Sequence, residues 1–384
     1  MKILNSNSKN FDKTLESLLL QRKKKVQSNS VSVTNIIKDV KKNGDKALLK
    51  YEKRFNQNNI IVPASKQISK LIKSLDKKVK QAIDLAYRRI YKFHSLQKVK
   101  NILYTDDLKN KLEYKYLPLE SVGIYVPGST ASYPSSVLMN AIPAIVAGVK
   151  RIIMINPGFK GKQNPAVLYA ARKCKIKEIY SIGGPSAIAA AAYGTRKINK
   201  VNKIVGPGNA YVVAAKKEVF GDVGIEGMTA GPSEITIVCD KFSNPEWVAS
   251  DLIGQAEHDN LAQCILISKD KSLIEKVENE ITKQLKEIPR ASIARKSLMN
   301  NGILMHITSD KKIIYVVNKI APEHLELNVK NYKSFILKIK NAGSICLGKY
   351  AVMAMTDYNV GSNHILPTNG SAKYSSGVSV NEFY

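Results

Sequence analysis

Two short clusters in the C-terminal half combine residue types that could bind a metal ion and move a proton. Gln255 and His258 are three positions apart at the end of an expected helix, so they lie on one helical face. Glu323 and His324 are adjacent and follow a proline, where a turn would present a carboxylate beside an imidazole. Histidine titrates near neutral pH, so this pair suits a general base with a proton relay.

A third cluster supplies further polar groups after the last expected strand. Asp357 and His364 lie in a loop that contains a glycine. Together the three clusters offer imidazoles, carboxylates and one carboxamide, which is the inventory for zinc acting as a Lewis acid beside a base. Each cluster taken singly is more typical of a helix cap or a surface turn, and Gln255 would be an unusual ligand. The spacing alone therefore leaves both interpretations open.

The sequence indicates no covalent nucleophile and no phosphate-binding loop. Three of the four cysteines lie within or beside expected strands, where a buried thiol is typical. Ser233 follows Gly-Pro and is not part of a GxSxG elbow. Neither GxxxxGK[ST] nor GxGxxG is present, and 206–209 is a compact turn before a helix whose N-terminus could approach an anion. The cysteine spacing gives no zinc-finger or disulfide framework, which favours reduced thiols in the cytoplasm.

The elements that must position these residues alternate between strands and helices from residue 121 onward, which predicts parallel sheets with right-handed crossovers. The expected strands are 122–126, 151–155, 178–182, 203–205, 235–238, 264–267, 302–307 and 344–347. The expected helices are 135–147, 165–174, 186–193, 210–219, 245–257, 273–286 and 311–320. Glycine and proline follow the first four strands, and ligands of open α/β sheets bind at that carboxyl edge.

Residues 1–120 have a different character, with apolar residues near a 3.6-residue period. This period predicts helices over 12–25, 33–55 and 65–94. The fold class that we expect is therefore α/β, with two Rossmann-like, doubly wound parallel-sheet domains and a helical N-terminal segment. The two sheet-forming blocks meet near Ser233.

The composition is strongly basic, with 60 Lys and Arg against 31 Asp and Glu and a net charge of +29. The excess is mostly lysine along expected helices, without interleaved aromatic residues or arginine, which favours a solvated face over a nucleic-acid footprint. No apolar run reaches the length of about 18 residues that a membrane-spanning helix needs, and the N-terminus has no secretory signal. We expect a cytoplasmic protein that binds neither nucleic acid nor membrane.

Seven motifs occur in order along the chain and carry a family resemblance. They are Gly123–Gly128, Pro134–Pro143, Val205–Asn209, Ala230–Glu234, Gln255–His258, Ala321–His324 and Gly361–Pro367. With these motifs the chain resembles the histidinol dehydrogenase family over essentially its whole length. The resemblance implies a four-electron oxidation of L-histidinol to L-histidine through L-histidinaldehyde, the last steps of histidine biosynthesis. It also implies one Zn²⁺ per subunit, two NAD reduced in succession, and a homodimer with intertwined subunits and shared active sites.

The resemblance assigns the zinc and catalytic positions residue by residue. Gln255, His258 and Asp357 look like the zinc ligands, and they would also face the substrate, whose imidazole would complete the zinc shell. Glu323 and His324 look like the catalytic pair. In this interpretation Glu323 activates water for the aldehyde step, and His324 takes the proton of the alcohol and contacts the substrate.

The resemblance also assigns substrate and cofactor contacts. Ser233 and His364 look like substrate contacts, and Tyr125 and Asn209 match cofactor-contacting positions. Ser186 stands where the family has a glutamine in its GGAQAIAA segment, so the side chain is shorter and lacks the amide. The absence of GxGxxG agrees with a family that binds NAD without that fingerprint.

The expected domain limits follow the two blocks. Residues 1–20 form an N-terminal arm, 21–121 plus 234–378 a first Rossmann-like domain with most zinc and catalytic residues, and 122–233 a second domain on the NAD side. Residues 379–384 begin a tail that relatives continue with a substrate-contacting glutamate and a histidine for the partner's zinc site. The alternatives are a truncated, zinc-poor and inactive form, oxidation of a related amino alcohol, and a non-catalytic protein that binds nucleic acid or an acidic partner.

Overall fold

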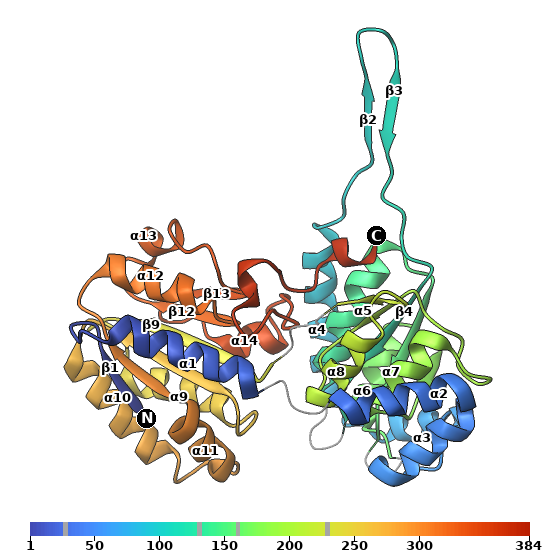
Figure 1. Cartoon of the computed structure of the whole chain (residues 1–384), viewed down its shortest axis with the longest axis horizontal. Coiled ribbons are helices and arrows are strands. Elements are labelled where there is room, and N and C mark those ends of the chain that lie inside the picture. Colours follow the sequence, from blue (N-terminus) through green and yellow to red (C-terminus); the bar gives the residue numbers. More distant parts are fainter. Residues whose placement is uncertain (26–29, 129–132, 159–161, 227–230) are drawn as a thin grey trace. The chain divides into compact units, whose positions relative to one another are not determined.

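The computed structural model describes residues 1–25, 30–128, 133–158, 162–226 and 231–384 (Figure 1). The chain forms two compact units. Unit 1 comprises Met1–Ser28, Thr229–Thr356 and Leu366–Gly377, and unit 2 comprises Asn29–Met228, Asp357–Ile365 and Val378–Tyr384. Each unit is built on a parallel sheet, which confirms the expected α/β class. Among the described residues, no helix has both the length and the apolarity required to cross a bilayer.

Unit 2 contains a five-stranded parallel sheet with the order β6-β5-β4-β7-β8. Its strands are β4 (Ser121–Tyr125), β5 (Arg151–Ile155), β6 (Glu178–Tyr180), β7 (Lys203–Val205) and β8 (Gly224–Ile225). Numbered along the chain, this order is 3-2-1-4-5, as in dinucleotide-binding sheets. The order reverses between β4 and β7, which are hydrogen-bonded neighbours. A ligand crevice is therefore expected at the carboxyl ends of these two strands.

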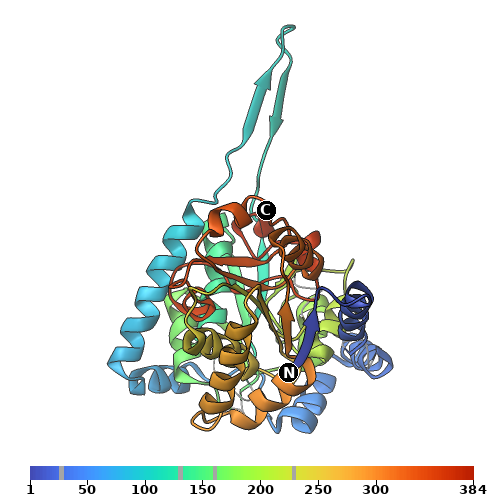
Figure 2. The ribbon, with the colours of Figure 1, turned by 90° about the vertical axis from the view of Figure 1, so that its left-hand side faces the viewer.

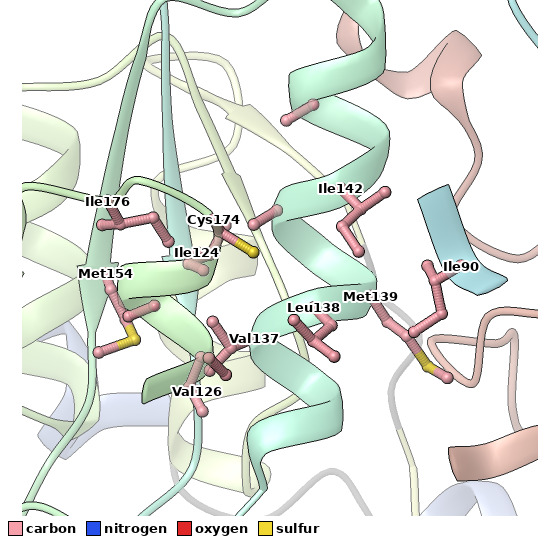
Figure 3. Packing of buried hydrophobic residues seen from close by; sticks show 14 of the residues in the cluster. Ile90, Ile124, Val126, Val137, Leu138, Met139, Ile142, Met154, Cys174 and Ile176 are labelled. Atoms are coloured by element: carbon pink, nitrogen blue, oxygen red, sulfur yellow. The ribbon is translucent and has the colours of Figure 1, made fainter. Parts of the chain in front are cut away.

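Helices cover both faces of this sheet, which explains why β4 is buried at every position. The two helical layers are α5 (Pro134–Ala147) with α6 (Pro165–Lys173), and α2 (Ser30–Tyr51) with α7 (Gly184–Tyr193) and α8 (Ala210–Glu218). Figure 3 shows Ile124 and Val126 of the sheet packed against Val137 and Leu138 of α5. Ile90 of α4 (Lys77–Ser95) packs beside Met139 of α5, so α4 adds an outer layer.

A separate antiparallel hairpin, β2 (Ile102–Thr105) and β3 (Lys111–Tyr114), belongs to unit 2. It projects away from the rest of the unit in both views (Figures 1 and 2). Every residue of the two strands is exposed. A two-stranded hairpin that packs against nothing is marginally stable in water.

Unit 1 contains a six-stranded parallel sheet with the order β1-β11-β10-β9-β12-β13. The strands are β1 (Lys2–Asn5), β9 (Glu234–Cys239), β10 (Gln263–Ser268), β11 (Ile303–His306), β12 (His324–Asn328) and β13 (Ser344–Leu347). From β9 onward the order is again 3-2-1-4-5, with β1 added at the edge. One face is covered by α9 (Pro245–Ala256), α10 (Lys271–Gln284) and α11 (Ala291–Asn301), the other by α1 (Phe11–Lys25) and α12 (Asp310–Ile320).

Several elements differ from the sequence prediction. The helix expected over 65–94 is two helices, α3 (Ser65–Ser74) and α4, because Leu75 is extended and the side chain of Asp76 caps α4 by accepting from Lys78 N. The turn expected at Glu323-His324 is wrong, since His324 begins β12. Asp357 lies in α14 (Met353–Tyr358) and not in a loop. Hairpin β2–β3, α11 and the short helix α13 (Tyr332–Ile336) are absent from the sequence prediction.

The division into units also differs from the expected domain limits. The helices α2, α3 and α4 belong to unit 2, because they pack on its helices α5 to α8. The first 25 residues are not a separate arm, because β1 pairs with β11 and the apolar side chains of α1 lie in the core of unit 1. Local sequence periods identify helices but do not specify the sheet on which they pack.

Candidate active site

The catalytic pair expected from the sequence lies at the amino edge of the unit 1 sheet, where the strand order reverses. Parallel pairing places His324 opposite Ile235, so Glu323 reaches the sheet beside Glu234. The backbone N–H of Glu234 donates to Glu323 Oε2 at 2.7 Å. Ser233 immediately precedes β9, and its carbonyl accepts from Gln263 N at 2.9 Å. The register therefore brings Ser233, Glu323 and His324 to one edge.

Glu323 and His324 are both buried, with 9% and 4% of their side chains exposed. Glu323 Oε1 lies 4.0 Å from His324 Nε2. An acid and an imidazole held this close can act on a single bound substrate, and the scarcity of surrounding water strengthens their electrostatic effect. This edge holds the amino ends of the strands, so the carboxyl-edge rule does not locate these residues.

Gln255 and His258 lie at the C-terminal end of α9, on the connection that leads to the amino end of β10. Gln255 is 1% exposed, and neither its amide oxygen nor its amide nitrogen has a hydrogen-bond partner among the described residues. An unpartnered buried amide costs about 1–3 kcal/mol. Burial lowers the pKa of His258, which favours the neutral imidazole that binds metals. Both observations fit a cation bound at this helix end.

Asp357 and His364 come together within unit 2. His364 Nδ1 is 3.0 Å from the backbone carbonyl of Asp357, and its Nε2 is 3.1 Å from the hydroxyl of Ser136 at the start of α5. Because a carbonyl only accepts, this pattern assigns the ring proton to Nδ1 and makes Nε2 an acceptor. Burial raises the pKa of Asp357 to about 7. A bound cation would favour the ionised carboxylate instead.

Among the described residues, no group of three or more His, Cys, Asp and Glu side chains could hold a metal ion. The expected set of Gln255, His258 and Asp357 contains only two of these residue types. Its carboxylate belongs to unit 2, whereas the other two side chains belong to unit 1. In the described residues, the amide of Gln255 and the carboxyl group of Asp357 are buried, and the imidazole of His258 is half-buried.

The expected cofactor residue Tyr125 ends β4, next to the point where the order of the unit 2 sheet reverses. Its hydroxyl accepts from Gly184 N, the first residue of α7, at 3.2 Å. Burial raises the pKa of Tyr125 to about 12, so the phenol stays protonated. Gly206, directly after β7, has φ +105°, and a Cβ there would lie 2.2 Å from Tyr125 O. The backbone after β7 therefore approaches the end of β4 only because residue 206 is glycine.

Ser186 and Asn209 also follow strands of unit 2, but their side chains bind their own backbone. Ser186 is 3% exposed, and its hydroxyl donates to Gly183 O at 3.1 Å. The side-chain oxygen of Asn209 accepts from Tyr211 N and Val212 N, both at 3.1 Å, and caps α8. Together with Tyr125 they mark the carboxyl edge of one sheet, as the sequence predicts.

Sequence reasoning missed several buried charged residues at the amino edge of the unit 1 sheet and at the carboxyl edge of the unit 2 sheet. Glu52 accepts from Gly183 N at 2.8 Å, and burial raises its pKa to about 7. Arg22 of α1 forms an ion pair with Glu234 and donates to Gln263 Oε1 at 2.6 Å. Glu234 lies within a quoted motif, but nothing in the local pattern distinguishes Arg22 or Glu52 from other helical charges. Only the tertiary contacts identify them.

The sheet topology defines an α/β protein of two doubly wound parallel-sheet units, of the class that includes dinucleotide-binding domains. The family model described as histidinol dehydrogenase matches residues 19–384. Histidinol dehydrogenase of Pelagibacter ubique is 81% identical over 384 residues, covering all of this chain and 90% of that protein. The chain belongs to the histidinol dehydrogenase family.

More distant relatives support the same family assignment. Histidinol dehydrogenase of Nitrosomonas europaea is 45% identical over 358 residues, covering 92% of this chain and 82% of that protein. The crystal structure of histidinol dehydrogenase from Elizabethkingia anophelis has a TM-score of 0.92 at 37% identity, covering 100% of this chain and 88% of that chain. The arrangement of both sheets is therefore that of the family.

Proposed function

We propose that the chain oxidises L-histidinol to L-histidine through L-histidinaldehyde, with two NAD reduced in succession, as the last steps of histidine biosynthesis. The observation that carries this proposal is the buried Glu323–His324 pair at the edge where β9 and β12 meet, in a chain 81% identical to a histidinol dehydrogenase. Both oxidations need a group that removes a proton from oxygen as hydride leaves carbon. A carboxylate and an imidazole at one edge supply two such groups.

The two groups divide the work between the two steps. His324 accepts the proton of the alcohol in the first oxidation. Glu323 takes a proton from the water that adds to the aldehyde, and the hydrate is then oxidised to the carboxylate. Their burial excludes bulk water, so neither proton is lost to solvent before the chemistry is complete.

The proposed zinc ligands are Gln255, His258 and Asp357, for one Zn²⁺ per subunit. The support from the structure is the buried amide of Gln255, which has no partner in the described part of the chain, and the neutral state that burial favours in His258. When bound, zinc would act as a Lewis acid on the substrate. We assign Ser233 and His364 to substrate binding, and the hydrogen bonds at both ring nitrogens of His364 fix its orientation.

We place NAD at the carboxyl edge of the unit 2 sheet, near Tyr125, Ser186 and Asn209. The strand order and the starts of α7 and α8 at this edge support the assignment, because helix N-termini favour phosphate groups. The side chains of Ser186 and Asn209 shape the two helix starts through their own backbone bonds. Tyr125 fixes the first N–H of α7 in the same way.

We propose a homodimer with shared active sites, in which hairpin β2–β3 contacts the partner. Pairing of Ile102 with Tyr114 and of Tyr104 with Leu112 puts four apolar side chains on one hairpin face. Their exposures are 56%, 61%, 60% and 57%, respectively. Such a face is typical of an interaction surface. We place the dimer in the cytoplasm, where the four buried free cysteines would stay reduced, and propose no nucleic-acid or membrane partner.

The test is NADH formation from L-histidinol, with zinc measured in the same sample. We expect two NADH per histidinol consumed and about one zinc per subunit. Turnover of a related amino alcohol without turnover of histidinol would overturn the substrate assignment. If the sample shows no turnover and contains no bound zinc, the proposed activity is overturned for this chain.

A further inference from the structure

A buried arginine lies at the amino edge of the unit 1 sheet, close to the Glu323–His324 pair. The Arg22 side chain is only 10% exposed and forms an ion pair with Glu234, whose side chain is 2% exposed. Its Nη1 also donates to Gln263 Oε1 at 2.6 Å. Arg22 comes from α1, Glu234 from β9 and Gln263 from β10, so the guanidinium joins three elements at this edge.

This arrangement brings the side chains of two buried glutamates, Glu234 and Glu323, into interaction with the same guanidinium. The Glu234 backbone N–H donates to Glu323 Oε2 at 2.7 Å, and the Glu234 side chain binds Arg22. Two buried carboxylates without a nearby cation repel each other, and one of them then binds a proton. A protonated Glu323 could not accept a proton from water.

The charge of Arg22 is coupled directly to Glu323. Burial lowers the pKa of Arg22 to about 9, and the charge of Glu323 acts in the opposite direction. An electrostatic interaction is reciprocal, so Arg22 favours the ionised form of Glu323 as much as Glu323 favours charged Arg22. Arg22 remains protonated at neutral pH.

We propose that Arg22 is a positioning residue whose positive charge keeps Glu323 ionised directly and also neutralises the buried neighbour Glu234. The inference rests on the role of Glu323 as a base in the proposed function. In the described part of the chain, the charged and titratable groups that face this cluster include Glu234 from β9, Cys264 from β10 and His324 from β12, while Glu16, Lys2, Lys319 and Lys373 line pockets beside Arg22. Arg22 is the cation that forms the ion pair with Glu234.

The test follows the titration of Glu323 itself and needs no turnover. Protein labelled with ¹³C at the glutamate side-chain carboxyl carbon is titrated by NMR, and the Glu323 resonance is identified by its absence in Glu323→Gln. In Arg22→Gln we expect Glu323 to titrate about one pH unit higher than in wild type. In Glu234→Gln we expect it to titrate lower, because a neighbouring negative charge is removed.

The double variant measures the Arg22 effect a second time. Adding Arg22→Gln to Glu234→Gln should again raise the midpoint by about one pH unit. This comparison also serves if Arg22→Gln alone does not fold, because replacing both partners avoids an unpaired buried carboxylate. An unchanged Glu323 midpoint between Glu234→Gln and the double variant would overturn the proposal.

Two controls separate charge from structure. Arg22→Lys keeps the charge and should leave the Glu323 midpoint near its wild-type value. Arg151→Gln removes an ion pair of 2.8 Å with Glu178 in unit 2. This variant should leave the Glu323 midpoint unchanged. In active enzyme with the aldehyde as substrate, the acid limb of kcat/KM should follow the same shifts. Wild type that makes no NADH would overturn the proposed function, whereas the NMR titration would still decide the role of Arg22.

Discussion

At the scale of single residues, the candidate site residues of each unit include groups that folding alone would not favour. Gln255 is buried and neither of its amide atoms has a partner among the residues that the structure describes, and burial raises the pKa of Asp357 to about 7. Such groups cost stability in the absence of a ligand. This is the pattern expected where binding, and not folding, selects the side chain.

Replacing Gln255 by Leu should therefore have opposite effects on stability and on zinc. The metal-free variant should be more stable by about 1 kcal/mol, since an unpartnered buried amide is removed. Its zinc affinity should fall at least about tenfold, since a ligand oxygen is lost. Urea unfolding after chelation and zinc titration measure the two effects. Unchanged zinc affinity would show that Gln255 is not a ligand.

Replacing each member of the catalytic pair should slow a different step of the reaction. His324→Asn should slow the first oxidation by about 100-fold or more, because the alcohol loses its proton acceptor. Glu323→Gln should preserve that oxidation and slow the second, so NADH per histidinol should fall from two towards one. Rapid-mixing measurements with histidinol and with the aldehyde distinguish the steps, and circular dichroism checks the fold. Identical defects in both variants would contradict this division.

At the scale of elements, strand order explains more than any single motif. Both sheets have the order 3-2-1-4-5, but the proposed cofactor residues lie at carboxyl ends and the catalytic pair lies at amino ends. On the carboxyl side of unit 1, the Ser243 hydroxyl donates to Asn328 O at 2.6 Å, and Asp240 accepts from Lys330 N at 2.8 Å. These hydrogen bonds join the loops that follow β9 and β12 at the carboxyl edge.

The π-helical turn Glu52–Asn56 contains a carboxyl group with a measurable effect on stability. Burial raises the pKa of Glu52 to about 7, above its ordinary value near 4.5, so the folded state prefers the protonated form. Stability should therefore fall as pH rises from about 4.5 to 7, by on the order of 3 kcal/mol. Glu52→Gln should raise the melting temperature at pH 8 and have little effect at pH 4.5, as thermal unfolding can measure.

Glu178→Gln is the matched control for this prediction. The hydrogen bonds from Arg151 lower the pKa of Glu178, so its ionised form stabilises the fold. The control variant should lower the melting temperature at pH 8, opposite in sign to Glu52→Gln. A lower melting temperature at pH 8 in both variants would mean that the Glu52 carboxylate stabilises its turn.

The sequence can predict elements whose signals are local. The bounds expected for 151–155, 203–205 and 344–347 agree with β5, β7 and β13, which are short runs rich in β-branched residues or bounded by loops. The sequence does not predict β12, because Pro322 favours a turn. Nor does it predict hairpin β2–β3, because the connection contains no glycine and Lys109 adopts φ +63° instead.

The candidate site also contains some residues that local patterns identify and others that they do not. Residue type and spacing identify Glu323, His324, Gln255 and His258 as candidates for chemistry. Arg22 cannot be found in this way, because its partners Glu234 and Gln263 lie more than 200 positions away. Pairing of that range depends on the sheet register, which a local pattern does not encode.

At the scale of the whole molecule, the hairpin gives a direct test of assembly. Tyr104→Thr with Leu112→Thr keeps β-propensity but removes half of the apolar face, so the proposed dimer should weaken at least about tenfold. Leu103→Thr, on the opposite hairpin face and 69% exposed, should leave the dimer intact. Sedimentation velocity over a concentration series measures both variants. An unchanged dimer in the double variant would exclude this face from the interface.

The edge strand β1 also has a consequence for synthesis of the chain. Its partner β11 leaves the ribosome about 300 residues later, an interval of roughly 15 to 60 s at ordinary translation rates. During that interval Phe11 and Leu15, which are 3% and 0% exposed in the folded chain, have no sheet to cover them. Helix α1 is thus made long before it is buried, and it offers chaperones an apolar surface throughout translation of unit 2.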